Sequence, residues 1–160
     1  MNQVNYSRLR PPVPTPADEK CACDAHSLLL MSLGGLAYNP IFCLICRGEV
    51  DPERIGLEQS EVDAVANWRY VYGAVDALEL DSGDYEKWAQ DELTRHDSPI
   101  NRKAFEVVRI LERHRPTYFN FWQGDNTYEA CPVGGDPLRP AEGNPGIFLC
   151  EEHRVAVLRS

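Results

Sequence analysis

Two similar pairs of residues, far apart in the chain, constrain the fold more than any other feature. Cys43-Leu44-Ile45-Cys46 is followed by Arg47-Gly48, and Cys150-Glu151-Glu152-His153 repeats the same spacing with a cysteine and a histidine. Two intervening residues let both side chains face one metal ion, and the glycine permits the reversed turn. Cys43, Cys46, Cys150 and His153 together make a common structural zinc set. Because about 100 residues separate the pairs, against about 15 to 20 in a compact finger, we predict an insertion between two zinc-binding halves.

A further cysteine leaves the ligand set open. Cys131 begins the segment Cys131-Pro132-Val133-Gly134-Gly135-Asp136-Pro137-Leu138, which looks like a zinc knuckle whose second cysteine has become Gly134. A second site built from Cys131, Cys150 and His153 is one ligand short. Either Cys131 has lost its role in metal binding, or ligands come from both halves of the chain.

The other cysteines can be explained without a metal site. Cys21 and Cys23 could contribute to a site, but a spacing of one residue is unfavourable for a single tetrahedral ion, so we interpret both, with Cys131, as small buried hydrophobes. Cys43 and Cys46 could instead form a redox dithiol. That alternative needs a helix after the pair, which Gly48 and Pro52 disfavour.

Composition bounds the setting of these cysteines. The chain has 160 residues, 43% of them apolar, which suits a single domain with a real core. The N-terminus shows no signal peptide, and the greasiest stretch, Leu28 to Cys46, is broken by Gly34-Gly35 and Asn39-Pro40, so no membrane span is expected. We predict a cytoplasmic protein, in whose reducing compartment clustered cysteines hold metal more often than disulfides.

The organisation expected is a flexible Pro-rich tail over 1–20 and a single zinc-stabilised domain over 21–160. Short strands are predicted near 28–33 and 41–43, and a helical insertion spans about 58–115. Its three helices begin at Ser60, with Asp63 completing a capping box, at Tyr85, and at Ser98, which caps a helix with Pro99 in its first turn. An aromatic hairpin over 117–122 and 127–129, a loop, and strands at 147–149 and 155–158 follow.

This order predicts an α+β fold class. Short β-hairpins from both chain ends would form a zinc-ribbon or knuckle unit, and the three-helix insertion would pack against it. The aromatic residues from Tyr118 to Trp122 could stack nucleic-acid bases, but at strand spacing they are interpreted as core.

For function, the sequence offers no catalytic constellation. It has no Gly-rich phosphate loop, no Gly-x-Ser-x-Gly elbow and no His-Glu-x-x-His, so we predict that the chain is not an enzyme. Structural Zn2+ with four protein ligands leaves no position for water. The net charge is −9, and acidic residues are dense over 51–61 and 76–92, which suits a basic partner protein.

One basic segment supports an alternative. Arg102, Lys103, Arg109 and Arg113 lie within a predicted helix, and three of them share helical spacing that could contact phosphates. We favour a solvated helix face as the explanation of these residues, because ordinary protein surfaces carry such mixtures of charge. Nucleic-acid binding therefore stays the alternative to protein binding, because the chain as a whole repels polyanions.

Several segments together resemble a known group of proteins. They are Asn39-Pro40-Ile41-Phe42-Cys43-Leu44-Ile45-Cys46, Trp68, Leu80 to Ala89, Ser98-Pro99-Ile100-Asn101, and the segments at Cys131-Pro132 and Cys150. From about Pro40 onward the chain is similar to bacterial zinc-ribbon-containing proteins of uncharacterised function with a double CxxC pattern. Gly134 and His153 stand where that pattern has cysteines. The resemblance implies an immunity protein against a toxin, or else a nucleic-acid binder. With the acidic balance and the lack of a catalytic constellation, we predict an immunity or antitoxin protein that neutralises a basic toxin, and a zinc-ribbon nucleic-acid binder is the alternative.

Overall fold

Six strands from both ends of the chain form one mixed sheet. The computed structural model describes residues 3–32 and 38–159, so the predicted turn at Gly34-Gly35 lies outside the described residues. The sheet order is β2-β1-β3-β6-β5-β4. β3 pairs in parallel with β1 and β6, and the other neighbours are antiparallel. The strands are β1 (Leu28–Leu30), β2 (Ile41–Cys43), β3 (Thr117–Asn120), β4 (Arg139–Ala141), β5 (Asn144–Cys150) and β6 (Val155–Leu158).

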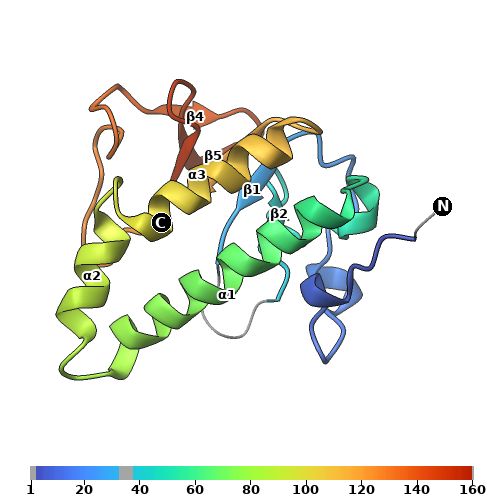
Figure 1. Cartoon of the computed structure of the whole chain (residues 1–160). Helices are drawn as coiled ribbons and strands as arrows, with labels where there is room; N and C mark the ends of the chain where they lie inside the picture. The colour runs from blue at the N-terminus through green and yellow to red at the C-terminus, as the bar shows by residue number, and fades with distance from the viewer. Residues whose placement is uncertain (1–2, 33–37, 160) are drawn as a thin grey trace.

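Helices α1 (Gln59–Asp81), α2 (Glu86–Thr94) and α3 (Pro99–Glu112) lie between β2 and β3 in chain order. α1 packs on both α2 and α3, and α3 packs on β3, so the helices cover one face of the sheet (Figure 1). A smaller apolar cluster lies on the opposite face. Short 3-10 turns, η1 (Ser7–Leu9), η2 (Ala17–Glu19) and η4 (Pro52–Arg54), precede α1. The predicted α+β class is confirmed.

The helix starts test two capping predictions. The Ser98 hydroxyl accepts the Asn101 N–H at 3.3 Å and Pro99 follows it, as predicted for α3. The predicted box of Ser60 and Asp63 is wrong, because Glu58 and Glu61 form the capping box of α1. Glu61 is buried and also contacts His114, and these contacts favour a helix start at Glu58 over one at Ser60.

β3 corrects the predicted aromatic hairpin. Residues 117–120 pair with β1 and β6, whereas 127–129 form no strand. Phe119 is fully buried and packs edge-on against Trp68, Tyr72 and Phe105, so the aromatic residues are core as interpreted. A strand this apolar is most stable at the centre of a sheet, with neighbours on both sides. Residues 139–141, predicted as loop, form the edge strand β4.

The N-terminal segment, predicted as a flexible tail over 1–20, lies against the start of α1. Leu9 is 1% exposed and belongs to the main core. The Tyr6 hydroxyl donates to the Leu57 carbonyl at 3.1 Å, and Arg8 pairs with Asp63 at 3.0 Å. Burial of Leu9 offsets the entropy of ordering the prolines around it. Among the described helices, none combines the length and apolarity that a membrane crossing requires.

Candidate metal centres

Four cysteines converge at one end of the sheet, and we call them the four-cysteine cluster: Cys21, Cys23, Cys43 and Cys46. Cys43 ends β2, and the chain then turns back with the Cys43 N–H donating to the Gly48 carbonyl at 2.9 Å. The Arg47 N–H donates to the Cys43 carbonyl, also at 2.9 Å. This turn presents Cys43 and Cys46 to the same point, as expected of a zinc knuckle.

Gly48 has a different role from the one predicted. The left-handed residue of the turn is Arg47, with φ 61°. A Cβ on Gly48 would meet the Cys21 backbone N at 2.6 Å, so the glycine instead lets the N-terminal segment approach. That segment is held there by the Cys21 N–H, which donates to the Glu49 carbonyl at 2.8 Å. Close packing at Gly48 therefore brings Cys21 and Cys23 to the knuckle.

The sulfur positions suit a tetrahedral ion. Cys23 Sγ lies 3.4 Å from Cys21 Sγ, 3.4 Å from Cys43 Sγ and 3.8 Å from Cys46 Sγ. Tetrahedral zinc with bonds of about 2.3 Å places its sulfurs about 3.8 Å apart, whereas a disulfide needs about 2.05 Å. The six cysteines are all free thiols. These separations fit shared coordination of one metal ion.

The thiols of this cluster are electrostatically unlike one another. Burial raises the pKa of Cys43 to about 12 and also raises the pKa of Cys21. The Ala25 N–H, with the Cys21 and Cys43 thiols, lowers the pKa of Cys23 to about 7. A divalent cation would supply the positive charge that buried thiolates need, since a coordinating thiol is deprotonated outright.

Two arginines hold the loop that carries Cys21 and Cys23. Arg54 donates to the Cys21 carbonyl at 2.6 Å and also to the Cys23 carbonyl. Arg115 donates to the Asp24 carbonyl at 3.1 Å, to the Ala25 carbonyl at 2.9 Å and to the Arg54 carbonyl at 2.6 Å. Such outer contacts orient metal ligands and tune the affinity for the metal.

A second group of four side chains, the mixed cluster, comprises Cys131, Asp136, Cys150 and His153. Cys150 ends β5 and His153 lies in the turn before β6. His153 Nδ1 lies 3.5 Å from Cys150 Sγ, 3.8 Å from Cys131 Sγ and 3.2 Å from Asp136 Oδ2. Cys131 is buried, as interpreted from the sequence, and its thiol faces the other potential ligands of this cluster.

The structure corrects the predicted ligand set by dividing it between the two clusters. Cys43 and Cys46 gather with Cys21 and Cys23, whereas Cys150 and His153 gather with Cys131. Asn144, at the start of β5, donates to the Ile45 carbonyl at 3.0 Å, whereas Cys150 ends β5 six residues later. Six strand residues span about 20 Å, and ligands of one ion lie within about 4 Å of each other, so these pairs cannot share an ion.

Sequence reasoning missed three of the side chains that the clusters contain. Cys21 and Cys23 were assigned to the core because their spacing does not make a knuckle, but each cysteine only needs to reach a knuckle formed elsewhere. Asp136 carried no signal of its own, although it follows the defective knuckle at Gly134 by two residues. Cys131, Cys150 and His153 supply only three of the four ligands of a tetrahedral site, and this shortfall is the signal that points to a further donor nearby.

The four basic residues of the alternative site lie on or just after α3, and two of them are paired. Lys103 Nζ lies 2.7 Å from Glu106 Oε2, and Arg113 lies 3.2 Å from Glu61 Oε1. Arg102 and Arg109 are exposed and line a shallow cleft with Arg154 and His153. Glutamates 106, 112 and 152 line the same cleft, so its charge is mixed.

Known proteins add no further constraint to this geometry. No family model, curated protein or solved structure matches the chain.

Proposed function

We propose that this chain is a non-enzymatic, zinc-stabilised binding protein of the immunity or antitoxin kind, which neutralises a basic toxin. The four-cysteine cluster supplies the structural zinc, because four thiolates in a tetrahedron select zinc among common cellular metals. The sheet and this zinc hold the helices, and the helices present the binding surface. The observation that carries the proposal is an apolar groove between α1, α2 and α3 beside a strongly acidic segment.

The groove has the size and lining of a protein-docking site. Its volume is about 550 Å³. Trp88 is 50% exposed at one wall and Val71 is 51% exposed at another. Aromatic and aliphatic side chains exposed together mark interaction surfaces more often than isolated ones do. The apolar lining comprises Trp68, Val71, Val75, Trp88, Pro99, Ile100, Val107 and Ile110.

The charge around the groove specifies the partner. From Asp76 at the end of α1 to Glu92 in α2, seven acidic residues are accompanied by one lysine. Burial, with a smaller contribution from the neighbouring Glu79 carboxylate, raises the pKa of Asp76 within this segment. A basic segment with apolar side chains on one face would complement both properties and would associate rapidly.

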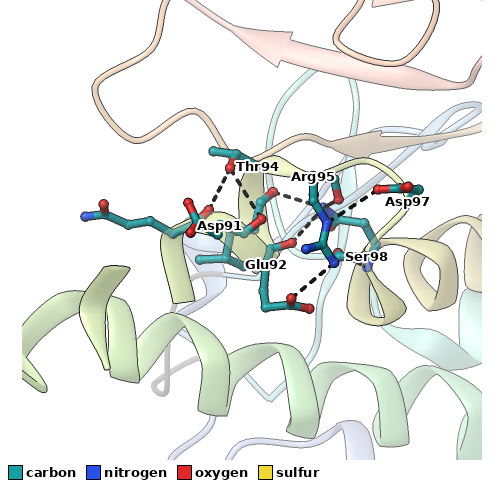
Figure 2. A network of polar contacts seen from close by, with 9 residues as sticks. Asp91, Glu92, Thr94, Arg95, Asp97 and Ser98 are labelled. Carbon is teal, nitrogen blue, oxygen red and sulfur yellow. Dashed lines mark hydrogen bonds and ion pairs between the residues drawn. The ribbon is translucent and has the colours of Figure 1, made fainter. Parts of the chain in front are cut away.

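A polar network joins the end of α2 to the start of α3 (Figure 2), and residues of both helices line the groove. Arg95 pairs with Glu92 at 3.2 Å and with Asp97 at 3.5 Å, and its carbonyl accepts the Ser98 N–H at 3.1 Å. Asn101 is buried there and donates to the Leu93 carbonyl at 2.9 Å. This network holds the helix ends in place before a partner arrives, which lowers the entropic cost of binding.

A pull-down from the native host, with Trp88→Ala as the test variant, examines the proposal. We expect the wild-type chain to capture a basic protein whose toxicity it suppresses on co-expression, and Trp88→Ala to lose at least about ten-fold in affinity. Tyr70→Ala is the matched control, since Tyr70 is 71% exposed on α1 outside the groove. Equal capture by Trp88→Ala, or a captured protein that is acidic or harmless to the cell, would contradict the proposal.

Nucleic-acid binding remains the second candidate because Arg102 and Arg109 are both exposed and line one cleft. Arg154 lines it too, but is paired with Glu112 at 2.7 Å and Glu151 at 2.8 Å. It predicts binding to DNA or RNA that weakens steeply as salt rises, and that Arg102→Glu with Arg109→Glu abolishes. Lys103 and Arg113, each already beside a glutamate, would contribute less. The absence of binding in low-salt buffer removes this candidate.

A further inference from the structure

We infer that the mixed cluster is a second, independent zinc site in which the Asp136 carboxylate takes the place of a missing cysteine. The inference does not depend on the proposed function, because it concerns only Cys131, Asp136, Cys150 and His153. It makes the protein a two-zinc protein whose two sites differ in chemistry.

The backbone around Cys131 is already a metal-binding knuckle. The Cys131 N–H donates to the Asp136 carbonyl at 2.8 Å, and the Gly135 N–H donates to the Cys131 carbonyl at 2.8 Å. Cys43 makes the same two bonds at the same spacing, with Gly48 and Arg47. The left-handed residue is Gly135 in one turn, with φ 78°, and Arg47 in the other, with φ 61°. The Cys131 turn therefore has the geometry of the Cys43 turn without its second sulfur.

The surroundings of Gly134 explain why no second cysteine stands at this position. A Cβ on Gly134 would lie 2.2 Å from His153 Cε1 and 2.5 Å from Asp136 Oδ2. No side chain at 134 is compatible with the present positions of the imidazole and the carboxylate. The histidine and the aspartate thus occupy the space that a second knuckle cysteine would use, and they bring two donor atoms to it.

The donor separations agree with one tetrahedral zinc. Bonds of about 2.3 Å to sulfur and about 2.05 Å to nitrogen or oxygen give sulfur–nitrogen separations of about 3.6 Å and a nitrogen–oxygen separation of about 3.3 Å. The observed values are 3.5 Å and 3.8 Å for His153 Nδ1 to the two sulfurs, and 3.2 Å to Asp136 Oδ2. Two thiolates, one neutral imidazole and one carboxylate form an ordinary zinc ligand set.

The exposure of the ligands sets the order in which they exchange. Cys131 and Cys150 are almost completely buried, whereas the Asp136 side chain is 40% exposed. A half-exposed carboxylate is a harder and more weakly held ligand for zinc than a buried thiolate. Asp136 is therefore the ligand of the mixed cluster that water or a chelator displaces first. Cys23 and Cys46 are exposed too, but all four ligands of their cluster are thiolates, so by ligand type the mixed cluster should lose zinc before the four-cysteine cluster does.

Zinc content and zinc-edge X-ray absorption of the full-length protein, purified without chelator, test the inference before any residue is changed. We expect two zinc ions per chain, with an average first shell of three sulfurs and one nitrogen or oxygen. One zinc per chain in a shell of four sulfurs would overturn the inference and leave the four-cysteine centre of the proposed function intact. One zinc with two sulfurs would support the mixed cluster and remove that centre.

Single substitutions then assign the second ion. Cys150→Ser should lower the content from two zinc ions to one, and Asp136→Asn should weaken one of the two ions by about 10- to 100-fold in chelator competition while leaving the other unchanged. Asp125→Asn, at an exposed turn, is the control. If Asp136→Asn and Asp125→Asn both release their two zinc ions at the same chelator concentrations as the wild type, Asp136 is not a ligand and the inference fails.

Gly134→Ala provides a test that removes no ligand atom. Its Cβ would displace His153, so we expect the weaker zinc to be lost in the same manner as in Asp136→Asn. Gly146→Ala is the matched control, because its Cβ would meet nearby atoms only at 3.5 Å. An unchanged zinc affinity in Gly134→Ala would mean that His153 does not bind the ion.

Discussion

Arg115 is predicted to control zinc retention without touching a sulfur atom. Its guanidinium donates to the carbonyls of Asp24 and Ala25, directly after Cys23, and to the carbonyl of Arg54. Arg54 in turn donates to the Cys21 carbonyl. Arg115→Met keeps most of the aliphatic packing and removes all three donors, so the loop carrying Cys21 and Cys23 loses its attachment to the end of α3.

The size of the effect follows from these bonds. A hydrogen bond contributes about 0.5 to 1.5 kcal/mol net, and more when the donor is charged and buried. Arg115 is only half-buried, so we assign about 2 kcal/mol to the three bonds together. In Arg115→Met, zinc binding has to supply the free energy of ordering the loop that the three hydrogen bonds supply in the wild type. A loss of about 2 kcal/mol corresponds to a zinc affinity about 30-fold weaker at the four-cysteine cluster.

Competition with a colorimetric zinc chelator measures this affinity directly. Arg109→Met is the control, since Arg109 is exposed on α3 and makes no hydrogen bond to this loop within the described part of the chain. The variant should release one zinc at lower chelator concentration, with the zinc of the mixed cluster unaffected. Release curves for Arg115→Met and Arg109→Met that coincide would refute the reasoning, since the three carbonyl contacts would then contribute nothing to the site.

Two further predictions concern the helices. Burial tends to raise the pKa of Glu61, but the Glu58 N–H, His114 and Arg113 outweigh it and hold that pKa below its usual value. The stabilisation by the Glu61 carboxylate is therefore present at neutral pH and is lost as pH falls through the lowered pKa. In urea unfolding, Glu61→Gln should be less stable than the wild type by about 1 to 3 kcal/mol at pH 7, and the difference should shrink in acid. Asn101→Ala should cost about 2 to 3 kcal/mol in the same assay, because the buried amide donates to the Leu93 and Arg95 carbonyls; exposed Asn126→Ala should cost almost nothing.

Local chemistry explains why part of the fold could be predicted. Ser98 and Pro99 mark the start of α3 because capping depends only on adjacent residues. The aromatic-rich composition at 117–122 likewise predicts a strand, but it does not say which strand will be its neighbour. The true neighbours, β1 and β6, come from distant parts of the chain, and the nearby 127–129 segment was chosen wrongly.

The same limit applies to the metal ligands. Spacing identifies Cys43 with Cys46 and Cys150 with His153, because each pair sits on one tight turn. Spacing does not identify which pairs meet, since that depends on how the strands that carry them are arranged in the fold. Asp136 could not be predicted at all from its residue type, because aspartates beside glycines in loops are common for reasons of turn geometry alone.

The positions of the two clusters in sequence also bear on the order of folding. Cys23 and Cys46 are 23 residues apart, and Cys131 and His153 are 22 residues apart. By contrast, Arg115 meets Ala25 across 90 residues, just before β3 aligns with β1. Short loops close at lower entropic cost and faster than long ones. Each segment that carries a cluster can therefore organise around its own cysteines early, and we expect the central pairing of β1 with β3 to form later.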